Sequence, residues 1–169
     1  MQNLISKEKK YDKILKLIKS NLSNYKSDYK QAKSYNHSLI NYSLDILYNK
    51  FPDWIFCGIY KKIDGELTID LYHSDKIPCS PISFEGVCGQ SIQKNSILNV
   101  PDVDKFPGHI VCDNNSKSEL CIPFKIDDIV YVLDIDSCKS NDFDKTDEIN
   151  LLEIIKIWSW TNYQLLFSQ

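Results

Sequence analysis

The sequence lacks a long apolar segment, a secretory signal and a large excess of one charge. A bilayer-spanning helix needs roughly 20 consecutive apolar residues, and no segment of the 169-residue chain reaches that length. The opening MQNLISKEKK has neither the apolar core nor the small-residue cleavage site of a secretory signal. The formal net charge of −3 gives no electrostatic reason to expect nucleic acid or an anionic membrane as a partner. We therefore expect an intracellular, cytoplasmic protein without either partner.

Closely spaced metal ligands are also absent. No CxxC pair occurs and the three histidines lie far apart, so the spacing typical of zinc sites is missing and we predict no metal. With 43% hydrophobic residues, the chain can bury a core without a disulfide framework. In a reducing compartment its cysteines are therefore either buried packing residues or redox-active thiols. The six cysteines are Cys57, Cys79, Cys88, Cys112, Cys121 and Cys138.

Helical periodicity marks both ends of the chain. Within residues 1–50, apolar residues recur at helical spacing in two runs separated by a polar stretch, residues 23–36, which is either a loop or a loosely packed helix. A closing helix is predicted over residues 145–167, with Asp144 or Thr146 as its N-cap and with Leu165 on its buried face.

Residues 54–137 predict a sheet with intervening loops. Compact or alternating apolar runs suggest strands near residues 55–60, 67–72, 97–100, 119–125 and 129–136, with a short helix over 89–94. The tight turns between strands favour antiparallel pairing. The long loop from Pro101 to Ser118 is of a kind that is usually functional or disordered. We predict one α+β domain over residues 1–169, with helices packed on one face of a mostly antiparallel sheet.

Four motifs follow one another within residues 86–137. They are GVCG at 86–89, GHIVCD at 108–113, SKSE at 116–119 and LDIDS at 133–137. The series resembles the free methionine-(R)-sulfoxide reductases, the catalytic branch of the GAF domains. The resemblance implies a GAF-like domain that reduces free L-methionine-(R)-sulfoxide to methionine. It also makes a homodimer an unsurprising state.

The resemblance implies roles for three cysteines. Cys112 stands at the position of the family's nucleophile, the thiol that becomes a sulfenic acid, and Cys79 and Cys88 stand at the resolving or recycling positions. Which of these two resolves the sulfenic acid is left open. A thiolate can attack the sulfoxide sulfur when the leaving oxygen is protonated. The resulting intramolecular disulfide then requires an external dithiol, expected to be thioredoxin-like, and no bound cofactor.

Carboxylates at family positions are expected to bind the substrate. They are Glu119, Asp134 and Asp136, with Asp102 as a further candidate. Crowding such groups raises one pKa, which would provide the proton donor, while the others hold the free α-ammonium group. The alternative is that Asp134 and Asp136 are surface residues. Alternation along a strand places these two on one face and Ile135 on the other.

Two aromatic residues, Phe56 and Tyr60, either line the substrate pocket or belong to the core. The family usually has Trp at the position of Phe56, and Trp54 is expected on the same strand face, where it would compensate. His109 is either a catalytic base or a structural hydrogen-bonding residue within its loop.

The remaining cysteines have no family role. Cys57 and Cys121 are expected in the core, and Cys138 is a candidate stray reactive thiol. Two other functions stay open: a GAF-type module that binds a ligand without turnover, and a redox sensor whose disulfide is the signal. The sensor would be oxidised by peroxide without preferring a sulfoxide.

Overall fold

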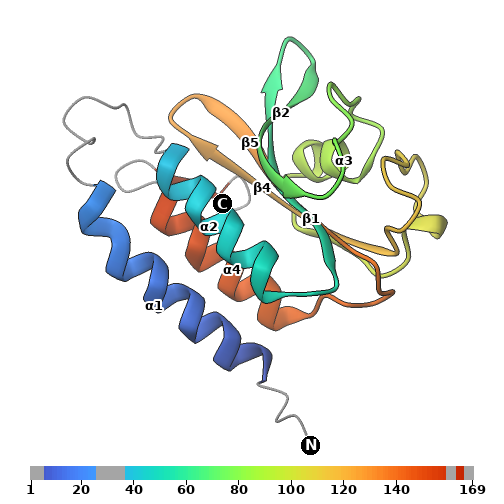
Figure 1. Ribbon diagram of the computed structural model, residues 1–169. Helices are drawn as coiled ribbons and strands as arrows, with labels where there is room; N and C mark the ends of the chain where they lie inside the picture. Colours follow the sequence, from blue (N-terminus) through green and yellow to red (C-terminus); the bar gives the residue numbers. More distant parts are fainter. Residues whose placement is uncertain (1–5, 26–36, 159–162, 166–169) are drawn as a thin grey trace, which may run out of the picture.

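The computed structural model describes residues 6–25, 37–158 and 163–165 (Figure 1). The helices are α1 (Lys7–Tyr25), α2 (His37–Lys50), α3 (Val87–Lys94) and α4 (Lys145–Trp158), with a short 3-10 helix at Val103–Lys105. The strands are β1 (Trp54–Ile63), β2 (Glu66–Ser74), β3 (Leu98–Val100), β4 (Ser118–Ile126), β5 (Ile129–Ser137) and β6 (Tyr163–Leu165). None of the described helices is long and apolar enough to cross a membrane.

The sheet has the order β2-β1-β5-β4-β3, and every neighbouring pair is antiparallel. Two tight hairpins fix its register. Asp64 and Gly65 join β1 to β2 with φ angles of 46° and 88°, the left-handed conformation that a two-residue hairpin turn needs. Asp127, with φ of 52°, opens the corresponding turn between β4 and β5. The predicted α+β class and antiparallel pairing are confirmed.

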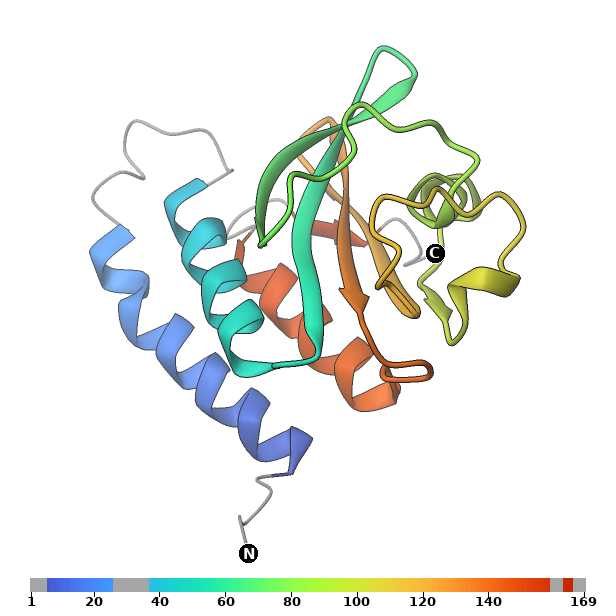
Figure 2. The ribbon, with the colours of Figure 1, turned by 45° about the vertical axis from the view of Figure 1, so that its right-hand side comes forward.

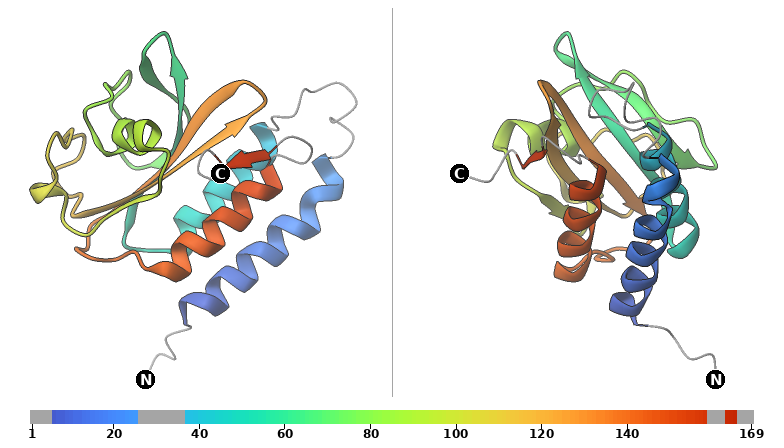
Figure 3. Two further views of the ribbon diagram at one scale, coloured as in Figure 1. Left: turned by 180° about the vertical axis from the view of Figure 1, so that it is seen from behind. Right: turned by 90° about the vertical axis from the view of Figure 1, so that its left-hand side faces the viewer.

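The two faces of the sheet are covered by different helices and carry different side chains. Helices α1, α2 and α4 pack together on one face, whereas α3 lies on the opposite face (Figures 1 and 3). Alternation along β5 produces this division: Leu133 and Ile135 enter the core beneath the three large helices, and Val132 and Asp134 face the α3 side. The apolar helix side supplies most of the buried core, which leaves the α3 side available for polar residues.

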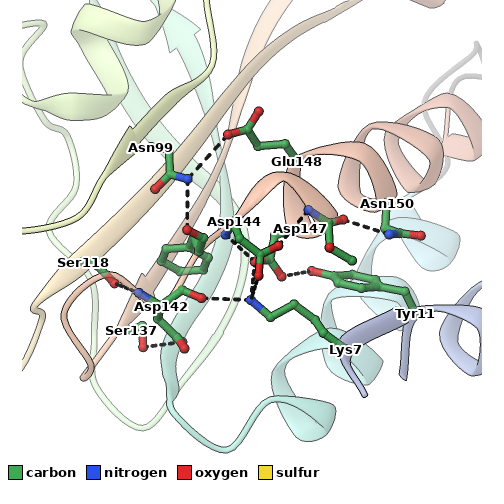
Figure 4. Close-up of polar contacts among 12 residues, drawn as sticks. Lys7, Tyr11, Asn99, Ser118, Ser137, Asp142, Asp144, Asp147, Glu148 and Asn150 are labelled. Carbon is green, nitrogen blue, oxygen red and sulfur yellow. Dashed lines mark hydrogen bonds and ion pairs between the residues drawn. The ribbon is translucent and has the colours of Figure 1, made fainter. Parts of the chain in front are cut away.

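A buried polar cluster attaches α1 to the start of α4 (Figure 4). The fully buried Asp147 accepts hydrogen bonds from Lys7 Nζ at 2.6 Å and from Tyr11 Oη at 2.8 Å. The same carboxylate accepts the backbone N–H of Asp144 at 2.8 Å, while Asp144 Oδ1 accepts the N–H of Thr146 at 2.7 Å. This reciprocal arrangement is a capping box with Asp144 as the N-cap. Of the two residues predicted as N-cap, Asp144 caps the helix and Thr146 does not.

Two sequence predictions about local structure are wrong. Helix α4 ends at Trp158, and Leu165 belongs to β6, which pairs with Phe124–Ile126 of β4 instead of extending the helix. A bulge in the pairing of β1 with β5 lies between Trp54 and Phe56. The extra residue breaks the alternation, so Trp54 stacks on Phe51 in the helix-side core, with ring centroids 4.1 Å apart. Most of the polar stretch 23–36 lies outside the described residues.

Candidate active site

A pocket lies on the α3 side of the sheet. Strands β1, β4 and β5 form its floor, and α3 forms one wall. The remaining walls come from two loops, residues 75–86 between β2 and α3 and residues 101–117 between β3 and β4, which lie on the same side of the sheet as α3 (Figure 2). The second loop falls within the long segment that was expected to be either functional or disordered.

Two of the three predicted redox cysteines are joined at this pocket. Cys112, in the second loop, lines the pocket and forms a disulfide with Cys79 of the first loop, with Cα atoms 5.6 Å apart. Tyr60 donates a hydrogen bond to the carbonyl of Cys79 over 2.9 Å, which fixes that loop against β1. Cys88 also lines the pocket, from the first turn of α3, and is 2% exposed. All three cysteines therefore gather where the two loops meet α3.

The pocket floor carries three carboxyl groups. Glu119 on β4 is paired in register with Asp136 on β5, and Asp134 stands two residues before Asp136 on the same face. Glu119 and Asp134 are each 6% exposed. Ser116 donates a hydrogen bond to Asp136 Oδ1 over 2.7 Å. Antiparallel register thus brings together carboxylates that are distant in the sequence.

Burial controls the protonation of this cluster. Desolvation raises the pKa of Glu119 well above its ordinary value, and the nearby Asp134 and Asp136 raise it further. Desolvation also raises the pKa of Asp134 to about 6, against the opposing hydrogen bonds from Cys88, Cys121 and Glu119. The pKa of Asp136 is raised by burial and by Asp134, with Ser116 opposing. Like-charge crowding contributes as expected, but loss of water is the larger cause.

Cationic side chains near the carboxyl cluster are few. Among the described residues that line the pocket, Lys76 and His109 are the ones able to carry positive charge. Lys76 Nζ is occupied by Asp113 at 2.6 Å. His109 Nε2 lies 3.8 Å from Glu119 Oε2, and burial lowers the pKa of this imidazole, which favours its neutral form. The floor of the pocket is therefore suited to receive a cationic group from a ligand.

Comparison with known proteins places the chain in a family. It is 37% identical over 155 residues to GAF domain-containing protein A of Dictyostelium discoideum, covering 90% of this chain and 92% of that protein. It is 33% identical over 129 residues to the free methionine-R-sulfoxide reductase of Escherichia coli (strain K12), covering 73% of this chain and 78% of that protein. The chain belongs to the free methionine-R-sulfoxide reductase family. A scan against protein-family models finds no match.

Solved structures agree with this assignment. The free methionine-R-sulfoxide reductase of Neisseria meningitidis, determined in complex with its substrate, superposes with a TM-score of 0.79 at 29% identity, covering 94% of this chain and 91% of that one. The reduced form of the Staphylococcus aureus enzyme superposes with a TM-score of 0.73 at 29% identity, covering 87% and 93%. Membership of the reductase family confirms the resemblance seen in the motifs and the GAF-like fold, and it makes the chain an oxidoreductase.

All but one of the residues predicted from the sequence to act in catalysis or substrate binding lie at the pocket. Phe56 and Tyr60 line the pocket, with ring centroids 6.2 Å apart. Asp102 does not line it: its carboxylate accepts the N–H of Asp104 over 3.2 Å and pairs with Lys105. Asp102 therefore acts as the N-cap of the short 3-10 helix, and its marking as a substrate ligand has no support from its position.

Sequence reasoning missed the position of Cys121. This residue is fully buried, as predicted, but it lies on the pocket face of β4 and not beneath the large helices. Its Sγ is 3.3 Å from Cys88 Sγ and donates to Glu119 Oε1 over 3.1 Å. The available signal was its spacing of two from Glu119, which puts both side chains on one strand face. Cys57 is buried on the helix side, and Cys138 is exposed.

Proposed function

We propose that this protein reduces free L-methionine-(R)-sulfoxide to methionine, with Cys112 as the nucleophile and Cys79 as the resolving thiol. The observation that carries the proposal is the disulfide between these two residues at the edge of a pocket with three carboxyl groups on its floor. Relatives that bear the name free methionine-R-sulfoxide reductase support the choice of substrate.

The reaction follows from thiol chemistry. The Cys112 thiolate attacks the sulfoxide sulfur and forms a sulfur–sulfur bond, while a carboxylic acid of the cluster protonates the sulfoxide oxygen. Transfer of the resulting hydroxyl from the substrate sulfur to Cys112 Sγ breaks both the sulfur–oxygen and the sulfur–sulfur bond, which releases methionine and leaves Cys112 as a sulfenic acid. The Cys79 thiolate then attacks the Cys112 sulfur, and the oxygen leaves as water. One sulfoxide and two thiols thus give methionine, one disulfide and water.

The carboxyl cluster would perform two tasks. A group whose pKa burial and neighbouring carboxylates raise well above its ordinary value, such as Glu119, can hold a proton to donate. A neighbouring ionised carboxylate can bind the α-ammonium group of the amino acid. A methionine sulfoxide within a peptide offers a neutral amide there, which cannot compensate the buried charge. The cluster thus accounts for a preference for the free amino acid.

The neighbours of the cysteines favour Cys79 over Cys88 as the resolving thiol. Cys79 is already bonded to Cys112, whereas Cys88 is in contact with Cys121 and is buried beneath the pocket. Burial also raises the pKa of the Cys88 thiol, which lowers its thiolate fraction. The completed disulfide must be reopened by an external dithiol, for which a thioredoxin-like protein in the cytoplasm is the proposed source.

Release of methionine from free L-methionine-(R)-sulfoxide tests the proposal. Purified protein with dithiothreitol is expected to convert this epimer and to leave the (S) epimer and a peptide-embedded sulfoxide unchanged. Cys112→Ser is expected to abolish release, while Cys138→Ser, which changes an exposed thiol outside the pocket, should match the parent protein. A folded, reduced protein that releases methionine from none of these compounds would leave a GAF module that binds a ligand without turnover.

Cys79→Ser separates the two steps. With Cys112 intact, this variant should release about one methionine per chain and then stop when thioredoxin is the reductant. The arrested protein should carry a sulfenic acid that a dimedone-type reagent labels. Continued turnover at the parent rate would assign resolution to another thiol.

A further inference from the structure

We propose that Cys88, Glu119, Cys121 and Asp134 form a binding site for zinc or a similarly thiophilic divalent cation within the pocket floor. The ligand atoms of these four residues, two thiol sulfurs and two carboxylate oxygens, all lie within 4.8 Å of one another. All four residues are buried. Sequence spacing had given no indication of a metal, because the ligands come from α3, β4 and β5.

Three of the distances between ligand atoms are compatible with tetrahedral coordination. With Zn–S near 2.3 Å and Zn–O near 2.1 Å, tetrahedral ligand atoms lie roughly 3.4–3.8 Å apart. The two sulfurs are 3.3 Å apart, and Cys121 Sγ lies 3.1 Å from Glu119 Oε1 and 3.5 Å from Asp134 Oδ1. Each of these edges needs to lengthen by only a few tenths of an ångström to admit the ion. Rotations of side chains can provide such a change without movement of the backbone.

Regular structure holds all four ligands in place. Cys121 on β4 is directly opposite Asp134 on β5, and Glu119 lies two residues away on the same strand face. Cys88 reaches them from the first turn of α3. Ligands fixed on strands and a helix lose little freedom on binding, which favours affinity. The second oxygen of Glu119 faces His109 Nε2 at 3.8 Å, the position of an outer partner that orients a ligating carboxylate.

The donor set selects the type of metal. Two thiolates exclude magnesium and calcium, which prefer oxygen ligands alone, and favour zinc or cadmium. Without a metal, the four groups have no cationic partner among the described pocket residues other than the partly buried His109. A divalent ion would replace the protons of the thiols and carboxyls and would neutralise the charge left behind.

Occupation of the site would interfere with catalysis. Glu119 and Asp134 are carboxyls that the proposed function assigns to the substrate, so metal and methionine sulfoxide would compete for them. This competition rests on the proposed function, but the metal binding itself does not. The reductase would then be inhibited reversibly by zinc through residues other than its nucleophile.

Binding is tested on the folded protein with the Cys79–Cys112 disulfide left intact, so that these two thiols cannot coordinate the probe. Titration with cadmium is expected to give one bound ion per chain and an ultraviolet cadmium–thiolate absorption band. Cys121→Val should remove the band and weaken cadmium binding roughly 100-fold or more, since loss even of outer partners costs 10–100-fold. Cys57→Val is the matched control, because it alters a buried strand cysteine on the opposite face.

Cys88→Ala is the second variant and should give the same loss if Cys121→Val fails to fold. An unchanged band in either folded variant, or no band in the parent protein, would overturn the proposal. In the turnover assay, zinc should raise KM without lowering kcat, and EDTA should reverse the effect. Zinc should inhibit Cys121→Val less than it inhibits the parent protein, with each rate compared with that protein's own rate without metal. Cadmium binding without turnover of any sulfoxide would reject the proposed function and leave the metal site standing.

Discussion

Asp134→Asn is expected to stabilise the fold near neutral pH while it weakens the site. The carboxyl of Asp134 is 6% exposed and lies among Glu119, Asp136 and two thiols. Its ionised form therefore loses hydration without gaining a cationic partner in the absence of a ligand. Asparagine has nearly the same shape and can keep a hydrogen bond, but it carries no charge to desolvate.

The magnitude follows from the pKa. Burial raises the pKa of Asp134 from 3.8 to about 6. Because one pKa unit corresponds to ~1.4 kcal/mol, this difference costs the folded state about 3 kcal/mol once the group is ionised. The folded state binds the proton more tightly than the unfolded state, so the protonated group stabilises the fold fully below pH ~4. This contribution is lost as the pH rises through about 6.

Urea denaturation from pH 8 to pH 4, with the disulfide intact, provides the measurement. At pH 7.5, Asp134→Asn should raise the free energy of unfolding by up to about 3 kcal/mol, and the gain should shrink toward zero near pH 4. The control is Asp12→Asn, which removes the same charge from an exposed position on α1. A variant that is less stable than the parent at pH 7.5, or a gain that is independent of pH, would refute the electrostatic argument.

Three further changes test other parts of the structure. Tyr11→Phe removes the O–H that donates to the buried Asp147 and should lower the free energy of unfolding by about 1–2 kcal/mol in urea; no loss would mean that this contact does not stabilise the α1–α4 attachment. Ser116→Ala removes a hydrogen bond that lowers the pKa of Asp136, so KM for the free sulfoxide should rise by roughly tenfold at neutral pH. An unchanged KM would count against Asp136 as a substrate ligand. Gly89→Ala would place a Cβ against the backbone of the preceding loop and should lower the free energy of unfolding by about 1–3 kcal/mol, and a neutral result in thermal unfolding would show that α3 can move.

The periodicity of apolar residues predicted most helices and strands, but it did not predict where a strand is irregular or where a helix ends. Alternation along β5 predicted that Asp134 and Asp136 share one face and that Ile135 faces the other, because pairing on both sides keeps that strand regular. Trp54 broke the same rule through a bulge, which depends on the register with the neighbouring strand and leaves no mark in the residues themselves. Leu165 was misplaced because a short apolar run fits a helix or a strand equally well.

The motifs identified the candidate redox cysteines, but they could not predict which side chains from different elements are in contact. Nothing in the linear order indicates that Cys121 meets Cys88, since that contact needs α3 to pack on β4. Asp102 shows a different difficulty. This acidic residue was a further candidate ligand, and its side chain satisfies the local backbone N–H of a 3-10 turn. Distinguishing a cap from a ligand requires the direction of the side chain, which only the fold determines.

The expected change in stability, the proposed substrate choice and the proposed metal binding have one electrostatic cause. A proton, an ammonium group and a divalent ion are alternative ways to compensate carboxylates that the pocket floor holds away from water. A pocket floor without Asp134 should make the fold more stable, but it should lose part of the interaction that, in the proposed function, distinguishes a free amino acid from a peptide. The energetic cost of burying these carboxylates would therefore be a condition of the proposed selectivity, as expected where function opposes stability. Asp134→Asn should accordingly raise stability, raise KM and weaken cadmium binding together. If the three effects separate, the carboxylates do not act as a single cation-binding unit.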